Sequence, residues 1–476
     1  MNRYGFLILA VILMAVVVGV IYIANTPRLV SFSPGDGDSA APASASLYLN
    51  FSRPLDNESL VNRLQIDPPV PGSFSWEANT LVFTPDQPWE PGERITVHLS
   101  AGTRAASVLA APIRDEFTWS FSIREPQIVF LFPADDPANI YTSDPVTGQT
   151  RQLIEHPGGI LGYHVSWNGT SIYYSVNQDD GSSQILRLDT GASIGAEFDS
   201  GPTDKIPEPE PVLVLDCLMA VCRVPRVSPN GEYLAYERTA SARGEGPYFP
   251  QVWYIALNQD DPPHPVLAGT ENHQTILPSW SPEGLLAFYD LDSAAFNFYD
   301  PASGDTISFT NQTGELGTWH PSGDYYVTPE ISFISSSSET NTGLEALAVS
   351  HLVRFNLLDG SSEDLTRGGN VEDTSPAFAP DGSALAFSRK YLDDQHWTPG
   401  RQIWITTEGA SEARQYTNSP NINHYDFAWS PDASRLVYVR FDKTQLTAPP
   451  EIWILDEVSG VSQRIIEGGF APQWIP

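Results

Sequence analysis

The chain has 476 residues, of which 41% are hydrophobic and 11% aromatic, enough for two or three folded domains. Its 58 acidic residues against 25 Lys and Arg residues give a net charge of −33 at pH 7. Such a surface repels phosphate backbones, which excludes nucleic acid as a partner, and most of the acidity is expected to form a solvated exterior.

The amino-terminal stretch from Gly5 to Ala24 carries no charge, and its length is close to the ~20 residues that cross a bilayer as a helix. Tyr22-Ile23-Ala24 is a poor cleavage site, so the stretch favours an uncleaved signal anchor over a cleaved signal peptide. Arg3 favours the short end staying inside. The sequence therefore predicts a transmembrane helix at residues 1–26 and a single-pass protein of the cell membrane. The bulk of the chain would then be extracytoplasmic, in the periplasm or on the cell surface.

Residues 27–125 alternate apolar and polar residues in short runs separated by Pro, Gly and Asn, a pattern typical of a small antiparallel β-sandwich. The stretches "FSPGDGD", "NFSRPLDNESL", "GSFSWEANTLVFTPDQPWEPGERITVHL" and "FTWSFSI" resemble, in this order, the bacterial Ig-like domain family of surface-layer and adhesin-type proteins. The resemblance implies a spacer or binding module with no catalytic site.

A repeat begins at about residue 126. Its units share an aromatic or apolar residue, a Pro-Asp-Gly-like turn and an apolar run, as in "PSWSPEGLLAFYD", "PAFAPDGSALAFSR" and "FAWSPDASRLVYVR". They start at Trp167, Val227, Trp280, Trp319, Phe378 and Trp429. Each unit predicts four short strands, a to d, which form one blade of a β-propeller.

The two ends of this region predict how the ring closes. The first unit, from Gln127, has strands b, c and d but no strand a, whereas the last residues, "FAPQWIP", read as a strand a with nothing after it. Trp474 stands where Trp429 and Trp280 stand in their own units. The carboxyl-terminal strand is therefore expected to complete the first blade, remove two exposed edges and give seven blades. The fold class predicted for the whole chain is all-β, after the amino-terminal helix.

The units resemble the TolB-like and WD40-like propeller repeats of bacterial envelope proteins, over residues 126–476. This motif specifies the fold but not the function, because TolB itself is a six-bladed, soluble periplasmic protein. A similar propeller gates some prolyl peptidases, but no hydrolase domain follows here.

Asp381, in "AFAPDGSALAFS", is interpreted as the corner of a turn. Its counterparts in other units are Asn230, Glu283, Ser322 and Asp432. A catalytic carboxylate could not be replaced by Asn or Ser, whereas a turn tolerates all of these residues.

Cys217 and Cys222 have a C-x4-C spacing without a second pair, which argues against a zinc site and leaves two interpretations: a small disulfide loop or two buried thiols. No nucleophile elbow, metalloprotease motif or phosphate-binding loop occurs. The sequence therefore predicts no catalytic residues, no metal site and no cofactor.

The long loops of the predicted propeller all lie at one of its two ends. The a–b and c–d turns, such as residues 228–231, are short, and we call their end the turn rim. The b–c and d–a connections form the loop rim and include residues 239–250, 331–346, 390–401, 442–450 and, as a d–a connection, 199–222. Long loops on a rigid scaffold often bind partners. The candidate binding residues are Tyr248, Phe249, Tyr391, His396, Trp397, His424 and Tyr425.

The sequence thus predicts a membrane-anchored, extracytoplasmic, non-enzymatic protein that binds a protein or glycan at the cell envelope. One alternative is a hydrolase or lyase that acts on a polysaccharide through the centre of the propeller. It requires acidic or histidine residues that converge there from several blades. Another alternative is a purely structural element of the wall or surface layer.

Overall fold

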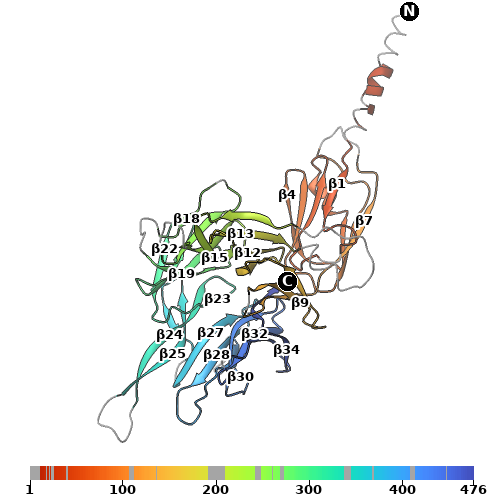
Figure 1. Ribbon diagram of the computed structural model, residues 1–476. Coiled ribbons are helices and arrows are strands. Elements are labelled where there is room, and N and C mark those ends of the chain that lie inside the picture. Colours follow the sequence, from red (N-terminus) through yellow and green to blue (C-terminus); the bar gives the residue numbers. More distant parts are fainter. Residues whose placement is uncertain are drawn as a thin grey trace, which may run out of the picture. The chain divides into compact units, whose positions relative to one another are not determined.

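The computed structural model describes residues 11–17, 19–20, 22, 26–38, 41–106, 112–135, 137–190, 210–241, 248–259, 261–267, 273–336, 345–366, 369–407, 413–445 and 447–476. These residues form two compact units, built mostly of β-strands (Figure 1). The first contains the chain up to Glu125, and the second contains the described residues from Pro126 onward.

The amino-terminal stretch corrects one prediction. Residues 11–17, 19–20 and 22 are helical, and residues 1–10 lie outside the described residues. A bilayer requires about 20 apolar residues in one helix. Within the described part of the chain, no helix is long and apolar enough to cross a membrane. The predicted transmembrane helix at residues 1–26 is therefore wrong, and so are the single-pass location in the cell membrane and the membrane contact through this helix.

The first unit is a sandwich of two antiparallel sheets with the strand orders β1-β2-β5-β4 and β3-β6-β7. Alternate side chains, among them Leu47, Phe83 and Trp119, fill one core between the sheets. The buried indole of Trp89 donates a hydrogen bond from Nε1 to the carbonyl of Ala45 (2.7 Å). The elements are β1 Leu29–Ser33, β2 Leu47–Phe51, α2 Asn57–Val61, β3 Leu64–Asp67, β4 Gly72–Glu77, β5 Thr80–Pro85, β6 Arg94–Leu99 and β7 Phe117–Ser122.

The second unit contains, within its described residues, seven four-stranded antiparallel blades. Blades 5 and 6 are also linked by a parallel bridge between Ser350 and Glu372. Strands a to d of blade 1 are β35 Phe470–Ile475, β8 Gln127–Phe132, β9 Asn139–Ser143 and β10 Thr150–Ile154. Those of blade 2 are β11 Ile160–Val165, β12 Ser171–Asn177, β13 Ser183–Asp189 and β14 Val212–Asp216. Those of blade 3 are β15 Ala220–Val227, β16 Tyr233–Ala240, β17 Gln251–Ala256 and β18 His264–Pro265.

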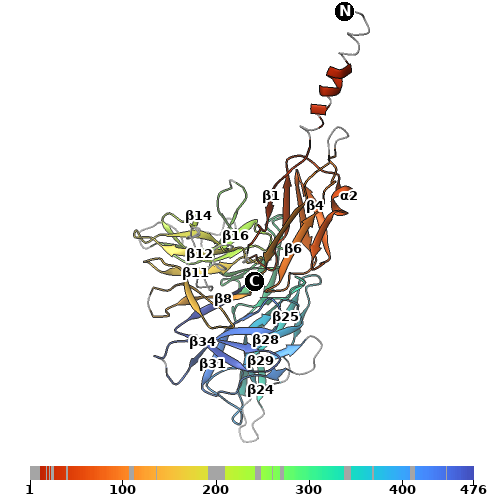
Figure 2. The same cartoon turned by 90° about the vertical axis from the view of Figure 1, so that its right-hand side faces the viewer.

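The remaining blades follow the same order along the chain (Figure 2). Blade 4 has β19 Thr275–Trp280, β20 Leu286–Asp290, β21 Ala295–Tyr299 and β22 Thr306–Thr310. Blade 5 has β23 Thr318–Trp319, β24 Tyr325–Ser336, β25 Glu345–Asn356 and β26 Ser362–Asp364. Blade 6 has β27 Val371–Phe378, β28 Ala384–Tyr391, β29 Gln402–Thr407 and β30 Arg414–Gln415. Blade 7 has β31 Ile422–Trp429, β32 Arg435–Asp442, β33 Glu451–Asp456 and β34 Ser462–Glu467.

The carboxyl-terminal strand closes the ring, as the sequence indicates. In β35, Trp474 pairs with Ile128 of β8 and Ile475 pairs with Gln127. The first blade is therefore assembled from both ends of the propeller sequence. Because β35 and β8 pair with each other, no unpaired strand edge is left between them where the ring closes.

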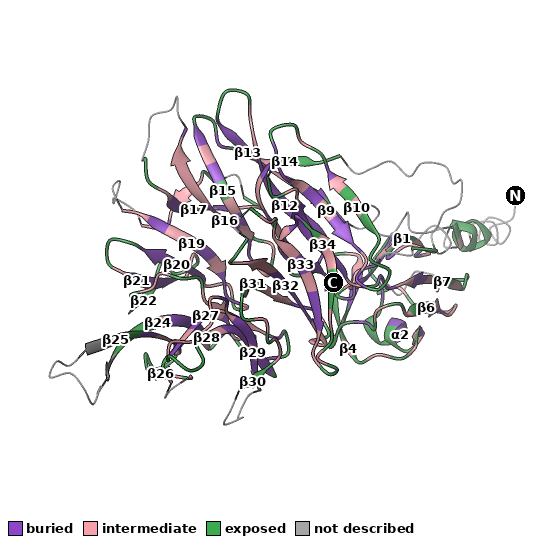
Figure 3. Cartoon of the chain, turned by 60° about the horizontal axis from the view of Figure 1, so that its bottom comes forward, coloured by how far each residue is buried: buried purple, intermediate pink, exposed green. Residues whose placement is uncertain are grey.

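Apolar clusters join successive blades and make the arrangement circular. Each cluster combines strands of two neighbours, for example Phe298 of blade 4 with Trp319 of blade 5. Blades 2–3, 3–4, 5–6, 6–7 and 7–1 are joined in the same way. Between blades 1 and 2, the hydroxyl of Tyr163 donates to the carbonyls of Val129 and Ala471, at 2.7 and 2.5 Å. In Figure 3 the buried residues run along the strands and the exposed residues gather in the connections.

A tryptophan contact repeats around the ring. Trp280, Trp429 and Trp474 each donate a hydrogen bond from the indole to a main-chain carbonyl of the preceding blade's inner strand, at 2.8, 3.0 and 3.0 Å. This supports the predicted equivalence of the three residues. Trp167 is different, because it lies in the a–b turn of blade 2 with 47% of its surface exposed, and Val165 ends the inner strand instead.

Candidate functional site: loop rim and centre of the propeller

The Pro-Asp-Gly turns have a structural role. Asp381 accepts hydrogen bonds from the amide and hydroxyl of Ser383, at 3.0 and 2.7 Å. Gly382 adopts a φ of +75°, which the turn requires. Partial burial alone would raise the pKa of Asp381, but the bonds from Ser383 outweigh it and hold the pKa below its ordinary value. Asn230 and Asp432 use a side-chain oxygen in the same way, so these groups are occupied by their own turns.

Five of the seven predicted binding residues lie on or beside b–c connections of the loop rim. Tyr248 and Phe249 are 86% and 48% exposed, and Trp397 is 57% exposed. His396 is exposed, and its Nδ1 contacts Oδ1 of Asp393 at 2.8 Å. Tyr391 is half-buried at the end of β28, where its ring meets those of His396 and Trp404.

The other two predicted residues are placed differently. His424 and Tyr425 lie inside β31 rather than in a loop. His424 is 1% exposed, and its Nδ1 contacts the Arg401 carbonyl at 2.7 Å. Burial lowers the pKa of His424 to about 4, although the bond to Arg401 opposes this. Tyr425 is half-buried against the apolar cluster between blades 7 and 1. Neither side chain therefore extends from a loop at the loop rim. The reason is that the inner strand β31 begins at Ile422, earlier than the sequence pattern indicates.

Two long connections also differ from their predicted assignment. Leu213 and Leu215 belong to β14, which pairs with β13 as the outer strand of blade 2. The connection after Asp189 is therefore c–d rather than d–a, and its residues 191–209 lie outside the described residues. In blade 5, much of the predicted loop 331–346 belongs to a long hairpin of β24 and β25, which carries the 73% exposed Phe333.

The two cysteines are joined in a disulfide between the end of blade 2 and β15. Cys217 and Cys222 are 5% and 1% exposed. The amide of Cys222 donates to the Ser183 hydroxyl at 2.7 Å, which ties β15 of blade 3 to β13 of blade 2. Of the two interpretations left open by the spacing, the structure has the disulfide.

A group of charged residues on the loop rim was not found from the sequence. Lys390 lies near the end of β28, Arg401 just before β29 and Lys443 just after β32, and we call them the rim cations. The amide of Arg401 donates to Asn423 Oδ1 at 3.2 Å and that of Lys443 to the Asn421 carbonyl at 3.0 Å, so both residues flank the start of β31. Lys390 Nζ lies 2.8 Å from Glu372 Oε2, and the Arg401 guanidinium contacts the other oxygen of the same carboxylate. The only local signal was that Lys390 and Arg401 flank one long loop.

The inner strands bring a second charged group together at the centre of the propeller. Arg226 donates from Nη1 to the carbonyls of Pro225 and Tyr163, at 3.0 and 3.3 Å. Asp426 of blade 7 and Glu237 of blade 3 interact electrostatically with Arg226. The main-chain amide of Leu277 donates to Glu237 Oε1 at 2.9 Å. These groups come from blades 2, 3, 4 and 7, so their proximity follows from ring closure.

The surrounding protein shifts the pKa values of the titratable residues at the centre of the propeller. Asp426 keeps some contact with solvent, but the protein around it still desolvates its carboxyl group and raises its pKa to about 6, partly offset by Arg226 and by the Ala471 amide. Burial also raises the pKa of Glu237 and lowers that of His164 well below its ordinary value. Asp426 has a φ of +57°, at a bulge that recurs at Val224, Leu277 and Ser375. Carboxyl groups with raised pKa values are candidates for acid–base chemistry.

One cluster could in principle hold a cation. His273 Nδ1 lies 3.6 Å from Asp290 Oδ2 and 3.9 Å from Asp292 Oδ2. Both carboxylate oxygens are already bonded within the same hairpin region, Asp290 to the Ser293 hydroxyl and Asp292 to the Gln274 amide. The hairpin itself therefore accounts for the position of the two carboxylates.

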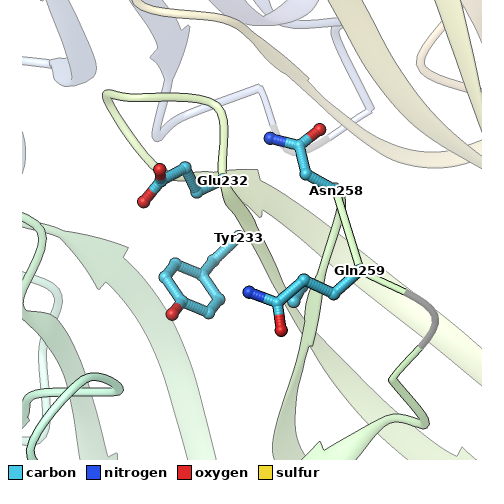
Figure 4. A pocket seen from close by; sticks show the side chains of 5 residues that line it. Glu232, Tyr233, Asn258 and Gln259 are labelled. Atoms are coloured by element: carbon cyan, nitrogen blue, oxygen red, sulfur yellow. The ribbon is translucent and has the colours of Figure 1, made fainter.

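A shallow pocket lies on the turn rim of blade 3, lined by Glu232, Tyr233, Ala256, Asn258 and Gln259 (Figure 4). Its lining includes one carboxylate, and Glu232 Oε2 accepts a hydrogen bond from Asn230 at 2.7 Å. The pocket thus lacks the paired titratable groups seen at the centre of the propeller.

Comparison with known proteins identifies the first unit. Residues 24–123 match the bacterial Ig-like domain family, and no curated protein matches the chain. Similar solved structures include a protein of Agrobacterium tumefaciens assigned as TolB, with 15% identity and a TM-score of 0.38, covering 73% of this chain and 91% of that one. TolB of Acinetobacter baumannii has 11% identity and a TM-score of 0.42, with coverages of 87% and 83%. A prolyl endopeptidase has 12% identity and a TM-score of 0.47, with coverages of 86% and 50%.

These TM-scores are all below 0.5, so the propeller assignment rests on the strand pairing and circular packing of the chain itself. The chain thus combines a region that matches the bacterial Ig-like domain family with a seven-bladed β-propeller that its own carboxyl-terminal strand closes.

Proposed function

We propose that the chain is an extracytoplasmic binding or scaffold protein of the cell envelope, whose loop rim binds a protein or a glycan. One observation carries this proposal. Among the described residues of the propeller, five aromatic side chains are strongly exposed. Three of them, Tyr248, Phe249 and Trp397, lie on b–c connections, and Phe333 lies on the long b–c hairpin of blade 5. Exposed aromatic residues supply large contact areas at binding surfaces.

The fifth exposed aromatic residue is Trp167, which lies in a turn of the opposite rim. It therefore provides a control of the same residue type and similar exposure. The bacterial Ig-like domain and the disulfide support a location outside the cytoplasm, because disulfides persist in oxidising compartments.

The test compares Y248A/F249A/W397A with W167A in the full chain. Binding to a glycan array and to immobilised, separately purified envelope proteins is measured by biolayer interferometry. We expect the triple variant to lose affinity for its partner about tenfold or more, since each substitution removes an exposed contact, and W167A to bind like the wild type. Equal binding by all three proteins, with unchanged circular dichroism, would rule out the loop rim as the binding surface.

The charged group at the centre favours a second candidate, a hydrolase or lyase acting on a polysaccharide. Asp426 and Glu237 supply two carboxyl groups that interact with Arg226 and have raised pKa values, and such groups can act in acid–base cleavage. The assay measures new chain ends released from bacterial polysaccharides by the wild type, D426N and E237Q, with D381N as a turn-rim control. Activity lost in D426N but kept in D381N supports this candidate, and the absence of any release by the wild type counts against it.

A further inference from the structure

The rim cations are unusual in a chain with a net charge of −33. Lys390 and Arg401 are mostly buried, with 17% and 19% of their side chains exposed, and both contact the single carboxylate of Glu372. Lys443 has no ion pair within 4 Å among the described residues. Glu315 interacts electrostatically with Arg401, and its Oε2 accepts a bond from Thr374. Lys390 and Arg401 therefore share the Glu372 carboxylate, and no ion pair among the described residues balances the charge of Lys443.

Repulsion among the positive charges of the rim cations is unfavourable. Burial lowers the pKa of Lys443, and so do the charges of Arg401 and Lys390. Burial also lowers the pKa of Lys390 and Arg401. An anionic group beside Lys443 would relieve this repulsion, because a charge-assisted hydrogen bond favours the charged amine.

An exposed indole lies in the same connection as two of these cations. Trp397 follows a turn in which its amide donates to the Asp393 carbonyl at 3.0 Å, and the main chain of Trp397 forms a bridge with Tyr391. Asp393 Oδ1 accepts the amides of Gln395 and His396, both at 2.9 Å. The turn holds the aromatic surface in place before a ligand arrives, which reduces the entropy lost on binding.

The main chain of this connection argues against a peptide that binds in extended form. The amides of Gln395, His396 and Trp397 are used within the turn. The amide of Gly400 donates to the Pro420 carbonyl and that of Arg401 to Asn423 Oδ1. Recognition of an extended peptide relies on free main-chain groups, and the amides of these five residues are already bonded within the protein.

We propose that the loop rim of blades 6 and 7 binds a uronate-bearing glycan, with Trp397 against the face of a sugar ring and Lys443, next to Arg401, receiving the carboxylate. This rests on the proposed binding function of the loop rim and names its ligand class. An aromatic face suits the apolar face of a sugar, and a cation supplies selectivity for the acidic form.

The test uses the full chain and two defined uronate probes: tetragalacturonate, and a tetrasaccharide of alternating glucuronate and N-acetylglucosamine. Each is compared by isothermal titration calorimetry with its methyl ester, which keeps the sugar and removes the charge. We expect at least one acidic probe to bind about tenfold more tightly than its ester. K443Q should remove that difference, and R354Q, which alters an arginine paired with Glu363 elsewhere in blade 5, should preserve it.

W397A separates this inference from the proposed function. If Trp397 contacts the sugar ring, W397A weakens both the acid and the ester. Equal affinity for acid and ester, with W397A still weakening both, overturns the uronate assignment but keeps the loop rim as a binding surface. If W397A and Y248A/F249A/W397A bind every probe and partner as the wild type does, the proposed function fails as well. No binding of either acidic probe, or equally tight binding of a tetra-aspartate peptide, also overturns the assignment.

Discussion

The turn rim and the loop rim are both rich in polar groups but differ in how these groups are used. On the turn rim, side-chain oxygens of Asp381, Asn230 and Asp432 bond main-chain amides two residues later. On the loop rim, Asp393 caps its own turn in the same way, but Trp397 remains exposed and Lys443 has no ion pair within 4 Å among the described residues. A repeated polar residue is therefore a poor indicator of function here, because its repetition reflects a turn that every blade must make.

The largest expected difference concerns two tryptophans at opposite ends of the propeller. Trp429 is 6% exposed and bonds the Ala377 carbonyl near the turn rim, whereas Trp397 is 57% exposed on the loop rim. W429A should lower the free energy of unfolding by about 3–5 kcal/mol, because it leaves a cavity, and W397A by less than about 0.5 kcal/mol. Urea unfolding measures both. Similar losses would show that the loop rim also depends on its aromatic residues for stability.

The disulfide gives the loop rim one covalent constraint. The double variant C217S/C222S should lower the free energy of unfolding by about 2 kcal/mol, because a short closed loop restricts the unfolded chain. The wild type measured with and without a reductant provides the control. If reduction changes the unfolding midpoint but the double variant matches the oxidised protein, the chain-entropy explanation is wrong.

A smaller effect tests the turn rim itself. Gly382 and Gly231 have φ values of +75° and +70° in equivalent turns, but a Cβ at Gly382 would lie 2.7 Å from His320 Nε2, whereas one at Gly231 meets nothing within 4 Å. G231A should cost about 1 kcal/mol from backbone strain, and G382A about 2 kcal/mol because His320 must also move. Thermal unfolding compares the two. An equal loss would mean that the His320 ring shifts freely.

The centre of the propeller should add a pH dependence of its own. The pKa of Asp426 is raised from 3.8 to about 6 in the folded state. Its contribution to stability is therefore fully present below about pH 4 and is lost as the pH rises through about 6. The free energy of unfolding of the wild type, relative to D426N, should fall between pH 4 and pH 6. Parallel profiles for the two proteins would show that Asp426 has an ordinary pKa.

Much of the architecture was predictable because its signals are local. The alternation in residues 27–125 predicts the sandwich, and the turn sequences predict the blades. Predictions from local sequence were wrong where contacts with residues distant in the chain determine the structure. His424 reads as a loop residue but is buried in β31, and Leu213 reads as loop but pairs with β13. The apolar run at residues 5–24 predicted a transmembrane helix that the described residues do not contain.

The sequence by itself determined the repeat, its turns and the completion of the first blade by Trp474 and its neighbours, because each depends on the geometry of a few consecutive residues or on one missing strand. Only the tertiary structure decided which charges meet. Lys443 and Arg401 come from the consecutive blades 6 and 7, whereas Asp426 of blade 7 interacts with Arg226 of the distant blade 3. The packing of neighbouring blades brings the first pair together and the closure of the ring brings the second pair together, and no local pattern of residues encodes either.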